Sequence, residues 1–176
     1  MQLFYDVFPT WLGWYAVLAS GRGVRRTSLK PSPQEALDDL GPRLQGAKAD
    51  PEQLKVVREV VTSFLKGEQA LLDQIDLDIE DAPLFYRAAW RACRSIPLGE
   101  TRSYAWLAVQ TGRFRAYRAA GQAMARNRAP LIVPCHRVIG SNGKLHGYAG
   151  GLELKDRLLR IECEIVARGR WARLGK

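Results

Sequence analysis

The stretch that most constrains the fold of this chain is LIVPCHRVIG, residues 131–140. Its apolar residues favour a buried strand, but Pro134, Cys135, His136 and Arg137 interrupt the run. A thiol, an imidazole and a guanidinium that are buried together need polar or ionic partners. Neighbouring side chains of a strand point to opposite faces. Cys135 and His136 can therefore cooperate only through a turn or 3₁₀ geometry, which Pro134 favours, or through a bridging water molecule.

Cys135 has two interpretations. A thiolate is the nucleophilic form of cysteine, and a histidine base that reaches the thiol through water would generate it. The alternative is an inert buried thiol. The chain has three cysteines and two histidines, with no CxxC pair and no framework spacing. We therefore expect reduced thiols in an intracellular compartment, and no structural zinc site.

The segment GGLELKDRLLRIEC, residues 150–163, predicts an amphipathic helix. Its apolar stripe consists of Leu154, Leu158, Leu159 and Ile161. At 100° per residue Glu162 falls inside this stripe, so its carboxylate should be buried and needs a partner. His136 is one candidate, since a carboxylate on one imidazole nitrogen makes the other nitrogen the acceptor. A salt bridge to an arginine such as Arg137 is the structural alternative.

Charge is distributed unevenly along the chain. Residues 1–81 hold 9 basic and 13 acidic residues, whereas residues 82–176 hold 18 basic and 5 acidic residues. No acidic residue occurs between Glu100 and Glu153. Such a field attracts a polyanion, usually a phosphate backbone, although a solvated basic face would show the same bias. No apolar run approaches the roughly 20 residues of a membrane helix.

The same shift in charge suggests two domains, residues 1–81 and 82–176. The first has the pattern of strands followed by two helices and offers no catalytic constellation, so we expect a scaffold. In the second, a helix that begins at Ser103 and ends at Gly112 precedes a short helix with a small-residue face and an arginine face. This pattern favours a helix-turn-helix, although many helical hairpins look similar.

Four motifs carry a resemblance to a known family. IPLGETRSYAWLA, YRAAGQAMARN, PCHRVIG and GYAGGLELKDRLLRIE follow one another within residues 83–163. In order and spacing they resemble the O6-alkylguanine-DNA alkyltransferases, also called methylated-DNA–protein-cysteine S-methyltransferases. The resemblance implies a mixed α/β (α+β) fold, with a small ribonuclease-H-like N-terminal sheet domain and a mainly helical C-terminal domain.

The resemblance also implies an activity. It is direct repair of double-stranded DNA, in which an alkyl group moves irreversibly from O6 of guanine to the protein after minor-groove binding and nucleotide flipping. No cofactor, metal, membrane or obligate protein partner is expected. We expect a cytoplasmic protein that associates with the nucleoid, or a nuclear one in a eukaryote.

Five residues match the family's catalytic positions. Cys135 would be the alkyl acceptor, His136 its water-mediated base, and Glu162 the acid that orients His136. Asn127 would tie the recognition helix to the active-site segment. Tyr104 would rotate the target phosphate and hydrogen-bond N3 of guanine. Arg137 would be a buried structural partner.

Other matches concern DNA and the substrate pocket. Arg118 would enter the base stack from the minor groove, and small residues would let the helix lie close to the DNA; the DNA-binding set is Arg118, Tyr104, Ala119, Gly121, Arg128 and Arg115. The carbonyls of Cys135 and Val138 would accept from the guanine amine. Val138, Tyr148, Ala149 and Gly150 would form the pocket wall.

Two substitutions depart from the family pattern. Ala149 stands where serine is common, which should matter little because the backbone N–H faces O6. Arg128 stands where proline is common and would add a phosphate contact. The zinc ligands that some members carry in the N-terminal domain are absent.

Two other classes of protein remain as rivals. Alkyltransferase-like proteins bind the lesion but lack the acceptor cysteine, which this chain has at Cys135. A cysteine peptidase or acyltransferase would need an oxyanion donor, and no side chain for that role is evident.

Overall fold

The computed structural model describes residues 1–68 and 71–174, and contacts divide the chain into two compact units. Unit 1 comprises residues 1–81 and 128–132, and unit 2 comprises residues 82–127 together with the chain from residue 133 onward. Residues 128–132, which fall within the predicted second domain, thus pack in unit 1. The mixed α+β class that the sequence predicts is confirmed.

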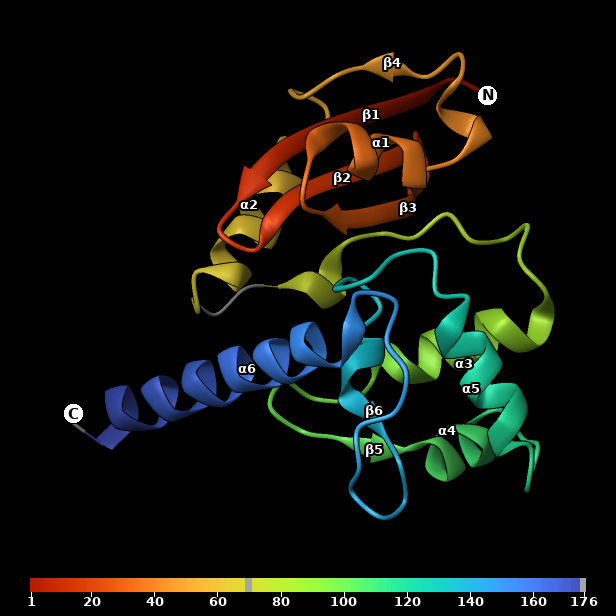
Figure 1. The fold of residues 1–176 in the computed structure, drawn as a ribbon, viewed down its shortest axis with the longest axis vertical. Helices are drawn as coiled ribbons and strands as arrows, with labels where there is room; N and C mark the ends of the chain where they lie inside the picture. The colour runs from red at the N-terminus through yellow and green to blue at the C-terminus, as the bar shows by residue number, and fades with distance from the viewer. Residues whose placement is uncertain (69–70, 175–176) are drawn as a thin grey trace. The chain divides into compact units, whose positions relative to one another are not determined.

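Unit 1 is built on a four-stranded sheet of order β3-β2-β1-β4 (Figure 1). Strands β1 (Leu3–Thr10), β2 (Gly13–Ser20) and β3 (Gly23–Lys30) form an antiparallel meander, and β4 (Lys48–Ala49) pairs with β1 in parallel. The turn between β2 and β3 requires Gly23. Its φ is 141°, and a Cβ there would lie 2.6 Å from the carbonyl oxygen of Asp76.

Helices cover the sheet of unit 1. Helix α1 (Pro33–Asp39) begins after Ser32, whose hydroxyl accepts from the N–H of Glu35, and packs a core cluster of Ala16, Leu18, Ala36 and Leu40. Short 3₁₀ turns follow at Pro42–Leu44 and Leu72–Gln74. Helix α2 (Lys55–Leu65) buries Val57, Val61, Phe64 and Leu65.

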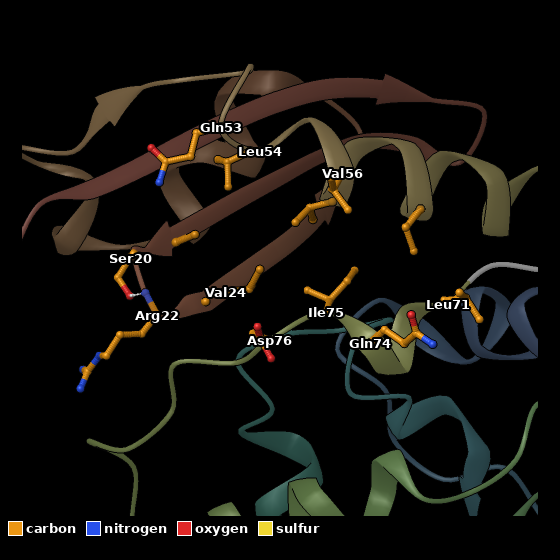
Figure 2. A pocket seen from close by; sticks show the side chains of 15 residues that line it. Ser20, Arg22, Val24, Gln53, Leu54, Val56, Leu71, Gln74, Ile75 and Asp76 are labelled. Carbon is orange, nitrogen blue, oxygen red and sulfur yellow. Dashed lines mark hydrogen bonds between the residues drawn. The ribbon is translucent and has the colours of Figure 1, made fainter.

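Unit 1 also contains a pocket of about 510 Å³ between the β2–β3 turn, α2 and the segment 71–76 (Figure 2). Val24, Leu54 and Ile75 contribute to its apolar wall, and Arg22 is among its polar residues. None of the residues that the sequence predicts for the active site lines this pocket.

Unit 2 is mainly helical (Figure 1). Helices α3 (Leu84–Arg94), α4 (Tyr104–Gln110) and α5 (Tyr117–Ala125) pack together, and the indole of Trp90 donates to the carbonyl of Ala123 at 2.8 Å. The pair α4–α5 has the arrangement of the predicted helix-turn-helix, with Ser103 as the N-cap of α4. The long helix α6 (Gly151–Leu174) completes the unit.

Two short strands position the active-site segment within unit 2. Strand β6 (Val138–Ile139) pairs in parallel with β5 (Arg102–Ser103), which runs directly into α4. The residues after Cys135 are thereby placed next to the start of α4, where Tyr104 lies. No helix in the described part of the chain is long and apolar enough to cross a membrane.

Candidate active site

The turn that Pro134 favours is present. Residues Cys135–Arg137 form one turn of 3₁₀ helix, in which the N–H of Arg137 donates to the Pro134 carbonyl at 2.9 Å. The interpretation of residues 131–140 as a strand is right only for Val138–Ile139. The residues before the cysteine are irregular because Leu131 has a φ of 74°, which a strand cannot accommodate.

The Cys135 thiol is buried, with 7% of the residue exposed. Its Sγ accepts a hydrogen bond from Nδ2 of Asn127 at 3.0 Å, and the same amide nitrogen donates to the Val133 carbonyl at 2.9 Å. Burial raises the pKa of Cys135, while the Asn127 hydrogen bond and the charge of Lys155 oppose this rise. The resting group is therefore a thiol at neutral pH, and it needs a base to become a nucleophile.

The predicted acid and base of the relay meet. Nε2 of His136 lies 2.6 Å from Oε1 of Glu162, and both side chains are fully buried. Burial lowers the pKa of His136 despite the hydrogen bond to Glu162. Burial would raise the pKa of Glu162, but His136 and Arg137 outweigh it and the pKa is lowered. At neutral pH we therefore assign an ionised Glu162 that accepts from Nε2–H of a neutral His136.

This tautomer leaves Nδ1 of His136 as the acceptor nitrogen. Nδ1 is buried and has no hydrogen-bond partner among the residues that the structure describes. A buried, basic nitrogen with a free lone pair is the group that a general base requires.

Glu162 also forms the salt bridge to Arg137 that was the alternative to its pairing with His136. The guanidinium Nε of Arg137 donates to both carboxylate oxygens, at 2.9 and 3.0 Å, and its Nη1 donates to the Ile96 carbonyl at 2.6 Å. The N–H of Gly99 adds a bond of 3.0 Å to Oε2. Glu162 thus orients His136 and pairs with Arg137 at once, so the two hypotheses are not exclusive.

Tyr104 lies at the first turn of α4, close to both the thiol and helix α5. Burial raises its pKa, and ionisation of Cys135 or Cys93 would raise it further. A Cβ added at Gly121 would lie 4.0 Å from Cδ1 of Tyr104. Its ring also meets the ring of His146 edge-on, with centroids 6.5 Å apart.

Lys155 is a site residue that the sequence reasoning missed. It is fully buried, and its Nζ donates to the carbonyls of Val138 at 2.7 Å and His146 at 3.0 Å. Burial lowers its pKa. Lys155 precedes Glu162 by seven residues, so the helical-face argument that placed the acid in the core would also have placed the lysine there.

One of the predicted pocket residues, Val138, contacts this lysine. The Val138 carbonyl accepts from Lys155 and keeps a second lone pair. Tyr148 and Gly150 are adjacent, since a Cβ added at Gly150 would lie 3.3 Å from Cε1 of Tyr148. Ala149 is exposed between them. The pocket role of these residues stays a prediction.

The predicted DNA-binding residues divide into two groups. Arg115 and Arg118 are exposed at the start of α5, with Ala119 and Gly121 partly buried behind them. Arg115 has a φ of 70°, a conformation that ordinary residues adopt rarely and mainly at turns and functional sites. Arg128 is placed elsewhere: in unit 1 its Nη1 donates to Oδ1 of Asp81 at 2.8 Å.

Known proteins are similar to this chain in sequence. Residues 84–164 match the family model described as the DNA-binding domain of 6-O-methylguanine DNA methyltransferase. The methylated-DNA–protein-cysteine methyltransferase of Methanosarcina barkeri is 45% identical over 112 residues, which cover 63% of this chain and 71% of that protein. Its counterpart from Mycolicibacterium paratuberculosis is 43% identical over 121 residues, covering 69% of this chain and 72% of that protein.

Solved structures extend the likeness over nearly the whole chain. The crystal structure of Mycobacterium tuberculosis OGT in complex with DNA matches with a TM-score of 0.78 and 30% identity, covering 92% of this chain and 94% of that one. The chain therefore belongs to the family of methylated-DNA–protein-cysteine methyltransferases.

Proposed function

We propose that this protein repairs O6-alkylguanine in double-stranded DNA by transferring the alkyl group irreversibly to Cys135. The observation that carries the proposal is the hydrogen bond of 2.6 Å between His136 and Glu162, because His136 lies in the same 3₁₀ turn as the buried thiol that Asn127 binds. The DNA-bound relative from Mycobacterium tuberculosis supports DNA as the partner.

Activation of the thiol uses the free nitrogen of the imidazole. The proton of Cys135 passes through a bridging water molecule to Nδ1 of His136, and the ionised Glu162 stabilises the resulting imidazolium. Asn127 stabilises the thiolate through its hydrogen bond to Sγ.

Transfer exchanges one bond for another. The thiolate attacks the alkyl carbon, so an S–C bond forms while the C–O6 bond breaks and its electron pair moves into the guanine ring. The proton held by His136 returns to the guanine product. Tyr104 at N3 and the N–H of Ala149 at O6 would stabilise the charge that develops there.

The buried thiol cannot reach O6 inside a stacked base pair, so the nucleotide must leave the stack, at a cost of a few kcal/mol. The exposed Arg118 would fill the gap that the flipped base leaves. Gly121 and Ala119 let α5 approach the narrow minor groove. Minor-groove readout is degenerate, which suits repair in any sequence.

The thioether product has no route back to a thiol, so each molecule acts once. Lys155 bonds the carbonyls of Val138 and His146, and would hold the loop of the pocket against β6. We place the protein in the cytoplasm with the DNA that it repairs. The three cysteines are free thiols, which suits a reducing compartment.

Incubation with duplex DNA that carries labelled O6-methylguanine tests the function. We expect the label to move from DNA to protein in a ratio that never exceeds one methyl group per molecule. Tight binding without transfer would instead indicate a lesion-recognition protein, and repeated turnover would indicate an enzyme of another class.

A further inference from the structure

One backbone carbonyl, five residues before Cys135 in the chain, accepts hydrogen bonds from two buried hydroxyl groups. The phenol of Tyr15, on β2, donates to the Pro130 carbonyl at 2.9 Å, and the hydroxyl of Thr27, on β3, donates to the same oxygen at 3.0 Å. Tyr15 is fully buried and Thr27 is 2% exposed. We call these two hydroxyls the hydroxyl anchor.

The segment 128–132 is attached to unit 1 at further points. The N–H of Thr27 donates to the Arg128 carbonyl at 2.8 Å, and the Arg128 guanidinium pairs with Asp81 at 2.8 Å. Asp81 also binds Arg25 and Arg43. The segment is therefore fixed by both its backbone and its side chains.

The anchored carbonyl precedes a strained residue. Leu131 is 1% exposed and has a φ of 74°, in the left-handed region that residues with a Cβ disfavour. Such a conformation persists only where the surroundings hold it. The orientation of the peptide between Pro130 and Leu131 sets this φ, and the hydroxyl anchor fixes that peptide by its oxygen.

The two residues that flank the strained segment belong to the hydrogen-bond network of Cys135. Asn127 precedes it and Val133 follows it in the chain. The Asn127 amide bridges the two ends, because it donates to the Val133 carbonyl and to Sγ of Cys135. A change in the path of residues 128–132 would therefore change the distance from the Asn127 amide to the thiol.

We propose that Tyr15 and Thr27 are positioning residues for alkyl transfer, which hold residues 128–132 in the strained path that keeps the Asn127 amide on Sγ of Cys135. Their role extends the proposed function, since it takes Cys135 as the acceptor. The N-terminal sheet then contributes to the reactivity of the thiol as well as to the scaffold.

The anchor has a measurable signature in the pH dependence of the thiol. The Asn127 hydrogen bond opposes the rise that burial causes in the pKa of Cys135, so loosening it should move that pKa upward. Four other titratable groups act near the thiol: His136, Cys93 of α3, Tyr104 of α4 and Lys155 of α6. The substitutions below leave all four unchanged, so a shift would come from the anchor.

The experiment measures alkylation of Cys135 by iodoacetamide between pH 6 and 10, followed by mass spectrometry of the Cys135 peptide. The variants are Tyr15→Phe, Thr27→Val and the conservative Thr27→Ser. Ser28→Ala is the matched control, because Ser28 is a buried hydroxyl on β3 that donates to Asp39. As the neighbour of Thr27 in the strand, it points to the opposite face of the sheet. Thermal melts of every variant show whether the protein is folded.

We expect Tyr15→Phe and Thr27→Val to react about three- to tenfold more slowly near pH 7 and to recover at high pH, because a higher pKa of the thiol leaves less thiolate at neutral pH. Thr27→Ser should follow the wild type, and Ser28→Ala should melt earlier with an unshifted profile. Profiles of both anchor variants that superpose on the wild type, or that match Ser28→Ala, would overturn the proposal. Iodoacetamide tests the anchor alone, while a failure of the wild type to react with O6-benzylguanine would count against the proposed function.

Discussion

His136 and Glu162 are 26 residues apart in the chain, and their side chains form a fully buried hydrogen bond of 2.6 Å. Arg137, the neighbour of His136, bonds the same carboxylate. One acid therefore fixes the orientation of the base and neutralises a buried guanidinium, which joins the chemistry of the site to its stability.

The relay should behave as a unit. Glu162→Gln and His136→Ala should each raise the apparent pKa of Cys135 alkylation and slow transfer, because each removes the stabilised imidazolium. The double variant should be little slower than either single one, since the losses share one pathway. The measurement is the rate of alkylation against pH for all four proteins.

Folding must be verified in those variants. Removing one partner of a buried ion pair typically destabilises a protein by about 3–5 kcal/mol, and Glu162 is the partner of Arg137. Glutamine keeps the shape and one acceptor oxygen, so thermal melts should show a folded protein. Fully multiplicative losses, or unshifted profiles in the single variants, would mean that Glu162 serves Arg137 alone.

Arg118 should matter for flipping and not for chemistry. Arg118→Ala should slow repair of duplex DNA far more than the reaction with free O6-benzylguanine, which needs no extrusion. The exposed Gln122, one turn later on α5, offers a control as Gln122→Ala. If Arg118→Ala slowed the reaction equally with both substrates, Arg118 would support the fold and have no role in flipping.

Arg128 has two candidate roles. The salt dependence of DNA binding and the pH dependence of stability can distinguish them. If Arg128 contacts a phosphate, its replacement by alanine should lower the slope of log K for DNA binding against log salt concentration by about one. As the partner of Asp81 it would instead affect stability. The structure favours the second role, so we expect Arg128→Ala to lower the melting temperature and to leave the slope unchanged.

The pH dependence of that stability follows from Asp81. Burial would raise its pKa, but the arginines 43, 128 and 25 lower it to about 2. The stability that they provide is present above the ordinary value of 3.8 and is lost as the pH falls toward about 2. The carboxylate is one-third exposed, so screening limits the effect to about 1 kcal/mol or less. The difference in melting temperature between wild type and Arg128→Ala should therefore shrink as the pH falls toward about 2. A smaller salt slope of Arg128→Ala at unchanged stability would instead support the phosphate contact.

Cys135→Ser should separate recognition from transfer. A hydroxyl near neutral pH is a much weaker nucleophile than an activated thiol, whereas the residues of α5 that are predicted to bind DNA are unchanged. The variant should bind alkylated duplex with an affinity near that of the wild type and transfer nothing. Binding is measured by fluorescence anisotropy, and methyl transfer near the wild-type rate would remove Cys135 as the acceptor.

Much of the site could be predicted because its signals are local. The helical period placed Glu162 in an apolar stripe, and Pro134 indicated the turn that the structure has at Cys135–Arg137. The left-handed Leu131 and the ion pair of Arg128 could not be predicted, because both depend on residues 128–132 packing in unit 1, against partners that lie between 47 and 115 residues earlier in the chain. Lys155 lies on the same helical face as Glu162. Its burial could not be predicted from that position alone, because lysine is rarely buried without a charged partner.

Cys135 should accept one alkyl group per protein molecule. The most direct measurement is mass spectrometry of the intact protein and its peptides after reaction with excess duplex that carries O6-methylguanine. We expect one methyl group to replace the thiol hydrogen of Cys135, and unmodified guanine to appear in the DNA in equal amount. Methyl on another residue such as the exposed Cys163, or loss of lesions in excess over protein, would contradict it.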